Sequence, residues 1–332
     1  MNLTRFNFAG RRPTAIVLGA GATRGASFVK PESIVKPPLD GDFFKILRVS
    51  TAARHDHRIR QLLGFVTDEF GSHDIRMESF YSQANLHDRF VSQIPTSKAG
   101  RRKSYSKRLE VFRSALPALL GESLSGHYCD YHDLLAKTID ANDTIISFNY
   151  DCLIDESLSR RAGKKWDARK GYGFAIENGY SRWHDRSGAG RPPVAGIQLL
   201  KPHGSLNWQR VLGKWNLREL PYESRPDADL HIVPPLWQKD FAEDPYQGVW
   251  AAARRVLTSV SSLLFVGYSL PDTDVYSQAM LRIDVGELDF LGIANPDPIA
   301  RRRIQDALRS SIGPETHIVE LDSMAQVAAL LH

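Results

Sequence analysis

The chain has 332 residues, of which 42% are hydrophobic, and carries a net charge of +5 with a pI near 9.1. This length and apolar content are enough to bury a large core, in one elaborated domain or two. The two cysteines, Cys129 and Cys152, exclude a disulfide framework, and no apolar run is long enough to span a membrane. We therefore expect a cytoplasmic protein without a membrane partner.

Basic residues gather in one segment of the chain. They are Lys98, Arg101, Arg102, Lys103, Lys107 and Arg108. Such a cluster can meet nucleic acid or an acidic partner. A solvated loop and helix start is the preferred interpretation, because Tyr105 alone interleaves the cluster and offers little base stacking. Nucleic acid is not indicated directly.

Short apolar runs alternate with segments of helical periodicity along the chain. The runs, several of them unbroken and typical of strands covered on both faces, are 15–18, 144–148, 196–201, 230–233, 262–267, 288–294 and 317–320. The predicted helices are 42–70, 76–94, 104–121, 130–140, 152–161, 245–260, 274–284, 297–310 and 323–331. This alternation predicts an α/β fold with a doubly wound, Rossmann-like parallel sheet.

The segment between the first two predicted strands is too long for a single crossover. We therefore predict a helical insertion at 40–135, inside an α/β domain formed by 1–39 and 136–332. A second irregular stretch, 162–195, is rich in glycine and aromatic residues. We interpret it as a loop or lid before the strand that leads to His203.

A glycine turn follows the first predicted strand. Gly19, Gly21 and Gly25 permit a tight turn and let backbone amides approach a pyrophosphate at a helix start. The spacing departs from the dinucleotide pattern G-x-G-x-x-G. A dehydrogenase also needs a second strand ending in an acidic residue about 20 residues later. The segment Pro37-Pro38-Leu39 is not a strand, so hydride transfer is disfavoured.

Two other strands end in polar side chains. Asn149 and Asp151 follow 144–148, and His203 follows 196–201. Asn149 and Asp151 are also suited to an Asx turn or helix cap, and a lone histidine is more often structural than catalytic. However, the carboxyl ends of strands are where open α/β sheets bind ligands. A neutral imidazole there is a natural general base, which we expect of His203.

The strand at 262–267 and the last core strand end in further candidates. Gly267 and Ser269 could form a second phosphate or ribose cradle, and Asn295 could meet a ribose. The structural alternative for the first of these turns is a helix start capped by Asp272 or Thr273.

Taken in order, the segments GAGAT, SFNYD, KPHGS, VGYSL and IANP resemble the sirtuin-type (DHS-like) NAD-binding fold. The resemblance is to its bacterial SIR2-like branch, whose members are often NAD⁺ hydrolases of antiphage defence systems. It implies that Asn149 is the catalytic asparagine and His203 the base. It implies nucleotide contacts for Gly19, Ala20, Gly21, Thr23, Asp151, Gly267, Ser269 and Asn295, with Asp151 at the nicotinamide. Phe148 replaces the family's glutamine in the second segment.

Protein-deacylating sirtuins carry two Cys-x-x-Cys pairs that bind zinc after the His-Gly segment. This chain has no cysteine after Cys152, so we expect no zinc module. His127, Cys129 and His132 lack a fourth ligand nearby, so we expect no metal there either. These departures favour hydrolysis, with NAD⁺ as the substrate.

The resemblance therefore predicts an NAD⁺ hydrolase that releases nicotinamide and ADP-ribose and depletes NAD⁺ during abortive infection. We expect a homo-oligomer, and an activating or regulating partner protein encoded nearby that contacts the insertion 40–135. Two alternatives stay open. One is a non-catalytic sensor that binds NAD⁺ or ADP-ribose, and the other is a zinc-less protein deacylase or ADP-ribosyltransferase.

Overall fold

A computed structural model describes residues 13–91, 99–177, 183, 196–223, 231–232 and 244–331, without the side chains of 88–104. Its centre is a six-stranded sheet in which every pair is parallel. The strands are β1 (Thr14–Leu18), β2 (Thr144–Ser147), β3 (Gln198–Leu200), β6 (Ser262–Val266), β7 (Leu288–Ala294) and β8 (Ile312–Leu321). The order β3-β2-β1-β6-β7-β8 confirms the predicted doubly wound sheet and places its switch point between β1 and β6.

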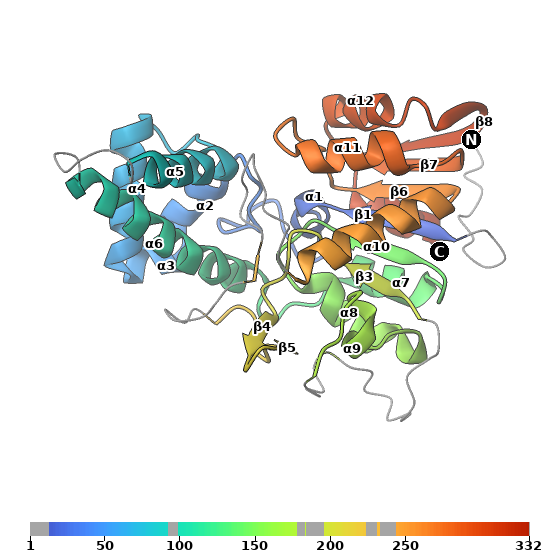
Figure 1. The fold of residues 1–332 in the computed structure, drawn as a ribbon, viewed down its shortest axis with the longest axis horizontal. Coiled ribbons are helices and arrows are strands. Elements are labelled where there is room, and N and C mark those ends of the chain that lie inside the picture. The colour runs from blue at the N-terminus through green and yellow to red at the C-terminus, as the bar shows by residue number, and fades with distance from the viewer. Residues whose placement is uncertain are drawn as a thin grey trace.

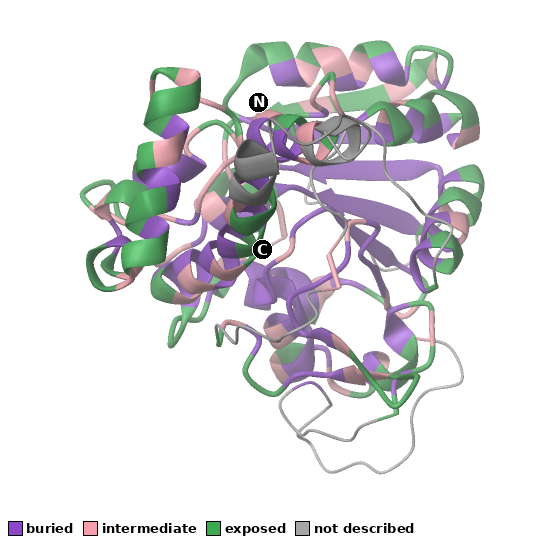
Figure 2. Cartoon of the chain, turned by 60° about the vertical axis from the view of Figure 1, so that its left-hand side comes forward, coloured by how far each residue is buried: buried purple, intermediate pink, exposed green. Residues whose placement is uncertain are grey.

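Helices cover both faces of this sheet (Figure 1). The chain runs outward in opposite directions through β2–β3 and through β6–β7–β8, so right-handed crossovers place their helices on opposite faces. One layer holds α7 (Asp130–Thr138), α8 (Leu153–Arg161) and α13 (Met324–Leu331), and the other holds α10 (Tyr246–Ser259), α11 (Val275–Asp284) and α12 (Pro298–Ala307). The central strands β1 and β6 are buried along their whole length, as Figure 2 shows. Unbroken apolar runs are the sequence signature of that burial.

The segment between β1 and β2 is helical and lies to one side of the sheet (Figure 1). The part that lies to the side spans 43–124 and contains α2 (Phe43–Val49), α3 (Thr51–His55), α4 (His57–Phe70), α5 (Met77–Val91) and α6 (Ala99–Leu124), whereas α7 packs on the sheet. Its core is aromatic: the rings of Phe44 and Phe80 are 5.1 Å apart, and Phe112 contacts both.

The stretch predicted to be helical at 42–70 is helical, but the chain divides it into three helices. Ser50 accepts a hydrogen bond from the Ala53 N–H, and Asp56 accepts one from the Arg58 N–H. Each of these side chains caps a new helix start, and this capping outweighs the continuous apolar periodicity.

A two-stranded hairpin, β4 (Trp208–Val211) and β5 (Lys214–Leu217), was not predicted. Its turn has positive φ at Leu212 and Gly213, which is the geometry of tight hairpin turns. The strand predicted at 230–233 falls partly outside the described residues. Of the two that are described, Ile232 forms an isolated bridge to Gly204 and does not join the sheet.

The stretch 162–195, interpreted as a loop or lid, begins instead as packed structure. It contains the short helices η1 (Gly163–Lys165) and α9 (Ala168–Gly171). Trp166 and Tyr172 are fully buried and meet edge to face, with ring centroids 5.5 Å apart. Most of 178–195 lies outside the described residues.

Within the described part of the chain, no helix combines the length and apolarity needed to cross a membrane. Of the basic segment 98–108, residues 99–108 lie at the start of α6. Lys98 and the side chains of 101–103 are outside the description, whereas the Arg108 guanidinium lies over the Phe65 ring.

Candidate functional site

The glycine turn packs backbone to backbone against the end of β6. The Gly19 N–H donates to the Val266 carbonyl (3.0 Å), and the Gly21 N–H donates to the Gly267 carbonyl (2.9 Å). A Cβ added at Gly21 would lie 2.7 Å from Gly267 Cα. Glycine is therefore required for this approach of the two strand ends at the switch point, where open α/β sheets bind ligands. Ala20, the first residue of α1 (Ala20–Arg24), stays exposed.

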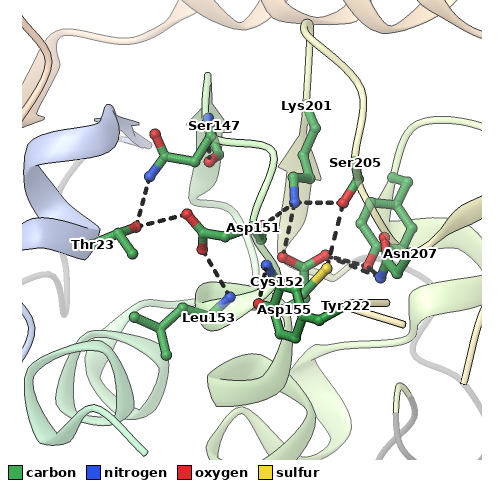
Figure 3. Close-up of polar contacts among 12 residues, drawn as sticks. Thr23, Ser147, Asp151, Cys152, Leu153, Asp155, Lys201, Ser205, Asn207 and Tyr222 are labelled. Atoms are coloured by element: carbon green, nitrogen blue, oxygen red, sulfur yellow. Dashed lines mark hydrogen bonds and ion pairs between the residues drawn. The ribbon is translucent and has the colours of Figure 1, made fainter. Parts of the chain in front are cut away.

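Asn149 and Asp151 reach from the end of β2 to this glycine turn. The Asn149 amide donates to the Gly19 carbonyl (3.0 Å) and to the Thr23 hydroxyl oxygen (3.1 Å). The Thr23 hydroxyl in turn donates to Asp151 Oδ2 (2.8 Å), as Figure 3 shows. The structure thus brings together side chains of two predicted segments that lie far apart in the sequence.

Asp151 also has the structural role that its position suggested. Its Oδ1 accepts a hydrogen bond from the Leu153 N–H (3.0 Å) at the start of α8. The turn and the contact with Thr23 coexist, because the two carboxylate oxygens serve different donors. Both Asn149 and Asp151 are buried, so their hydrogen bonds hold them in a fixed orientation.

His203 lies beside Asn149, Thr23 and Asp151 and is surrounded by aromatic side chains. Its ring centroid is 5.0 Å from that of Phe148 and 6.3 Å from that of Trp250. Phe148 also stacks on Tyr268, with centroids 4.5 Å apart and planes at 11°. Phe148, which replaces the glutamine of the resembled motif, directly precedes Asn149. It therefore connects His203 to the end of β2 and, through Tyr268, to the end of β6.

A carboxylate that the sequence did not single out faces His203. The distance between Asp274 Oδ2 and His203 Nε2 is 3.6 Å, and the two side chains are 4% and 12% exposed. The hydroxyls of Tyr268 and Ser277 both donate to that same oxygen, at 2.8 Å. Asp274, and neither Asp272 nor Thr273, is the residue at the start of α11.

The remaining candidates line the next strand end. The Asn295 amide donates to the Tyr268 carbonyl (3.1 Å), so Asn295 supports the turn that contains Gly267 and Ser269. Ser269 is exposed, and its carbonyl accepts from Arg303 (3.0 Å). All the predicted site residues therefore lie along one edge of the sheet.

Comparison with known protein families matches residues 143–285 to the SIR2-like domain. The segment from β2 to the end of α11 is a SIR2-like domain. It contains Asn149, Asp151, His203, Gly267 and Ser269, whereas Gly19 to Thr23 and Asn295 lie outside it. No curated protein matches the chain. The domain supports an NAD-related enzymatic function of the sirtuin type.

The SIR2-like domain also holds a buried ion pair that sequence reasoning missed. Lys201 Nζ donates to the Asp151 carbonyl and to Ser205 Oγ (both 2.6 Å) and lies 3.2 Å from Asp155 Oδ2 (Figure 3). Lys201 and Asp155 have fully buried side chains. With Ser205, Tyr172 and Asn207 they form the group that we call the Lys201 cluster.

The Lys201 cluster is electrostatically paired. Burial lowers the pKa of Lys201, but the neighbouring negative charges, with that of Asp155 the largest, together outweigh burial, so the net shift is upward and the ammonium stays charged. The Tyr172 hydroxyl donates to Asp155 Oδ1 (2.5 Å), and the Asn207 amide donates to the Tyr172 oxygen (3.0 Å). The cluster therefore joins the Asp151 turn to the turn that carries His203.

The helical segment outside the SIR2-like match also contacts the site. Glu78, near the start of α5, is buried and accepts a hydrogen bond from the Thr273 hydroxyl. Thr273 directly precedes Asp274. Burial, and then the charges of Glu78 and Asp274, raises the pKa of Tyr150 well above its usual range, so that phenol stays protonated.

The three residues considered as metal ligands do not converge on one point. The distance between His132 Nδ1 and Cys129 Sγ is 3.0 Å, whereas the His127 ring stacks on Phe28. Burial raises the pKa of Cys129, but His132 outweighs it and brings that pKa down to about 7. Among the described residues, no set of three histidine, cysteine or acidic side chains is arranged to hold a metal ion.

Proposed function

We propose that the protein hydrolyses NAD⁺ to nicotinamide and ADP-ribose at the edge formed by β1, β2, β3 and β6. The observation that carries this proposal is the hydrogen-bonded set Asn149–Thr23–Asp151, with His203 beside it through Phe148. An amide, a carboxylate and an imidazole at a switch point are the groups needed to position a nucleotide and a water.

In this reaction water forms a bond to the ribose C1′ while the bond from C1′ to the nicotinamide nitrogen breaks. Nicotinamide leaves as a neutral molecule with the electron pair of that bond. His203 accepts the proton that the water loses, and Asn149 positions the water. Asp151 holds the carboxamide, and the turn around Gly267 holds the adenosine half. The transition state is cation-like, so nearby carboxylates stabilise it.

The test is the release of nicotinamide from NAD⁺ by the purified chain and by two variants. His203→Ala and Asn149→Ala should each lower the rate by about 100-fold or more, because each removes a group that acts on the water. Matched controls are His57→Ala and Asn142→Ala, at exposed positions away from the site. Circular dichroism should show that all four variants are folded. Wild-type rates in both site variants would refute the assignment.

The same assay separates the two alternative functions. A sensor would retain labelled NAD⁺ without cleaving it. A deacylase or ADP-ribosyltransferase would release nicotinamide only when an acceptor protein is added. Hydrolysis by the chain without an acceptor supports the proposed function against both.

We further propose that the activity depletes NAD⁺ in antiphage defence and is restrained until a partner protein or self-assembly activates it. The contact between Glu78 and Thr273 supports this proposal, because it joins α5 to the loop that carries Asp274. NAD⁺ turnover should rise when the product of a neighbouring gene is added, and Leu86→Glu on the exposed face of α5 should weaken that response. Full activity of the purified chain alone would contradict the proposal that its activity is restrained until a partner or self-assembly activates it.

A further inference from the structure

The residue that faces His203 comes from a different strand end. Asp274 follows β6, whereas His203 follows β3, and the sheet order separates these strands by β2 and β1. Their contact therefore depends on the tertiary fold and not on local chain geometry. Only the Nε2 side of the ring faces this carboxylate at 3.6 Å, a distance for charge attraction and not for a direct hydrogen bond.

Other titratable groups surround this contact. The Tyr268 hydroxyl donates to Asp274, and burial followed by the charge of Asp274 raises the pKa of Tyr268 well above its usual range. The charge of Glu78, on α5, contributes to raising the pKa of both Tyr268 and Tyr150. The charge of Asp40 also contributes to raising the pKa of Tyr150, and burial raises the pKa of Asp40 itself. Asp274 is the charged group in direct ion-pair range of the ring among those described.

We infer that Asp274 is a positioning residue for His203: it holds the imidazole proton on Nε2 and stabilises the imidazolium that forms after proton transfer. The Nδ1 lone pair is then the one that accepts a proton. Because Tyr268 and Ser277 both donate to Asp274 Oδ2, the carboxylate is itself held in a fixed orientation. This inference rests on the proposed function for its catalytic meaning, but its physical content is a property of the ring.

The test is the titration of the His203 ring by NMR in protein labelled at histidine Cε1, with the resonance assigned by its loss in His203→Gln. Asp274→Asn removes the charge and keeps the shape, so the pKa of His203 should fall by about one unit, a tenfold change in its protonation ratio. Asp272→Asn is the matched control, because it removes a carboxylate from the same loop whose side chain is 84% exposed and pairs with Arg303. The His203 pKa should not move in that variant.

A pKa of His203 that is equal in Asp274→Asn and wild type would overturn the inference. If Asp274→Asn does not fold, the ¹⁵N chemical shifts of the His203 ring in wild-type protein test the inference, because they show which ring nitrogen carries the proton. The Nε2–H tautomer supports the inference, and the Nδ1–H tautomer overturns it. For an active enzyme, the acid limb of the rate profile should also move to lower pH in Asp274→Asn. Loss of the proposed function would leave the ring titration unaffected, so the two failures are distinguishable.

Discussion

Two polar groups at the same edge of the sheet differ in how completely they are buried. In the Lys201 cluster, the ammonium and its partner carboxylate are 0% exposed. In the site group, His203 keeps 12% of its side chain exposed and faces its carboxylate at 3.6 Å. Complete burial with matched partners is the arrangement of a structural ion pair, whereas an accessible imidazole can meet a substrate. A charged residue at a strand end is therefore not by itself evidence of chemistry.

The largest effect on stability should come from breaking the Lys201 cluster. Lys201→Met should lower the free energy of unfolding by about 3–5 kcal/mol, because it leaves the buried Asp155 carboxylate without its counter-charge. Urea denaturation measures this loss. The double variant Lys201→Met/Asp155→Leu should recover most of it, since both buried charges are then gone. A double variant as unstable as the single one would show that the cluster is not a paired scaffold.

The next largest effect should come from Gly267. Gly267→Ala should lower the free energy of unfolding by about 2–4 kcal/mol. The φ of +62° is strained for alanine, and the new Cβ would lie 2.0 Å from the Ala22 nitrogen. Gly213→Ala is the matched control, with φ of +79° and no atom within 4 Å of the added Cβ. Gly213→Ala should lower the free energy of unfolding by only about 1 kcal/mol, because backbone strain is its sole penalty. Equal losses in both variants would mean that the approach of β1 and β6 is not tight.

A smaller loss should follow from Thr23→Val, which keeps the shape and removes the hydroxyl. That hydroxyl donates to Asp151 and accepts from Asn149, so its loss should cost about 1–2 kcal/mol in unfolding free energy. Calorimetric titration should also show weaker NAD⁺ binding, because both site residues lose their orientation. Thr23→Ser should behave like the wild type in both measurements, and a Ser variant as weak as Val would exclude the hydroxyl as the cause.

The smallest effect should appear at an ion pair that is neither fully buried nor part of the site. Asp133 pairs with Arg160 and Arg161, and although burial raises the pKa of Asp133, these partners lower it overall. Asp133→Asn should cost about 1 kcal/mol at pH 7. Because the pKa of Asp133 is lower in the folded state than its unfolded value of 3.8, the ionised carboxylate stabilises the folded protein at pH values above 3.8. This stabilisation is lost as the pH falls below that value. The difference from wild type should therefore shrink in urea titrations below about pH 4, and a constant difference would contradict the pairing.

The sheet could be predicted because its strands are encoded locally. Leu288–Ala294 and Ser262–Val266 are apolar runs bounded by turn residues, and they form strands close to those limits. The break at Ser50 could have been found from its capping side chain, but apolar periodicity on both sides concealed it. The hairpin turn at Leu212 left only one signal, Gly213, because leucine with positive φ is rare.

For the candidate site, the sequence could indicate residues that the fold brings together, but it could not indicate their contacts. Asn149, Asp151 and His203 stand out because each follows an apolar run. Lys201 did not stand out, because its partner Asp155 lies 46 positions away and a lysine after a strand is ordinarily exposed. Asp274 was not a candidate, because the sequence offered Asp272 and Thr273 as helix caps, and only the fold places Asp274 opposite His203.

The helical segment between β1 and β2 has a consequence for biosynthesis. Thr23 meets Asp151 at a separation of 128 positions, and Gly19 meets Asn149 at 130. Such contacts form late, because long-range pairing must await the synthesis and ordering of the intervening chain. The glycine turn must also wait for Gly267. A nascent chain still on the ribosome therefore lacks the assembled site until β6 emerges, so the hydrolysis that we propose could not begin during translation.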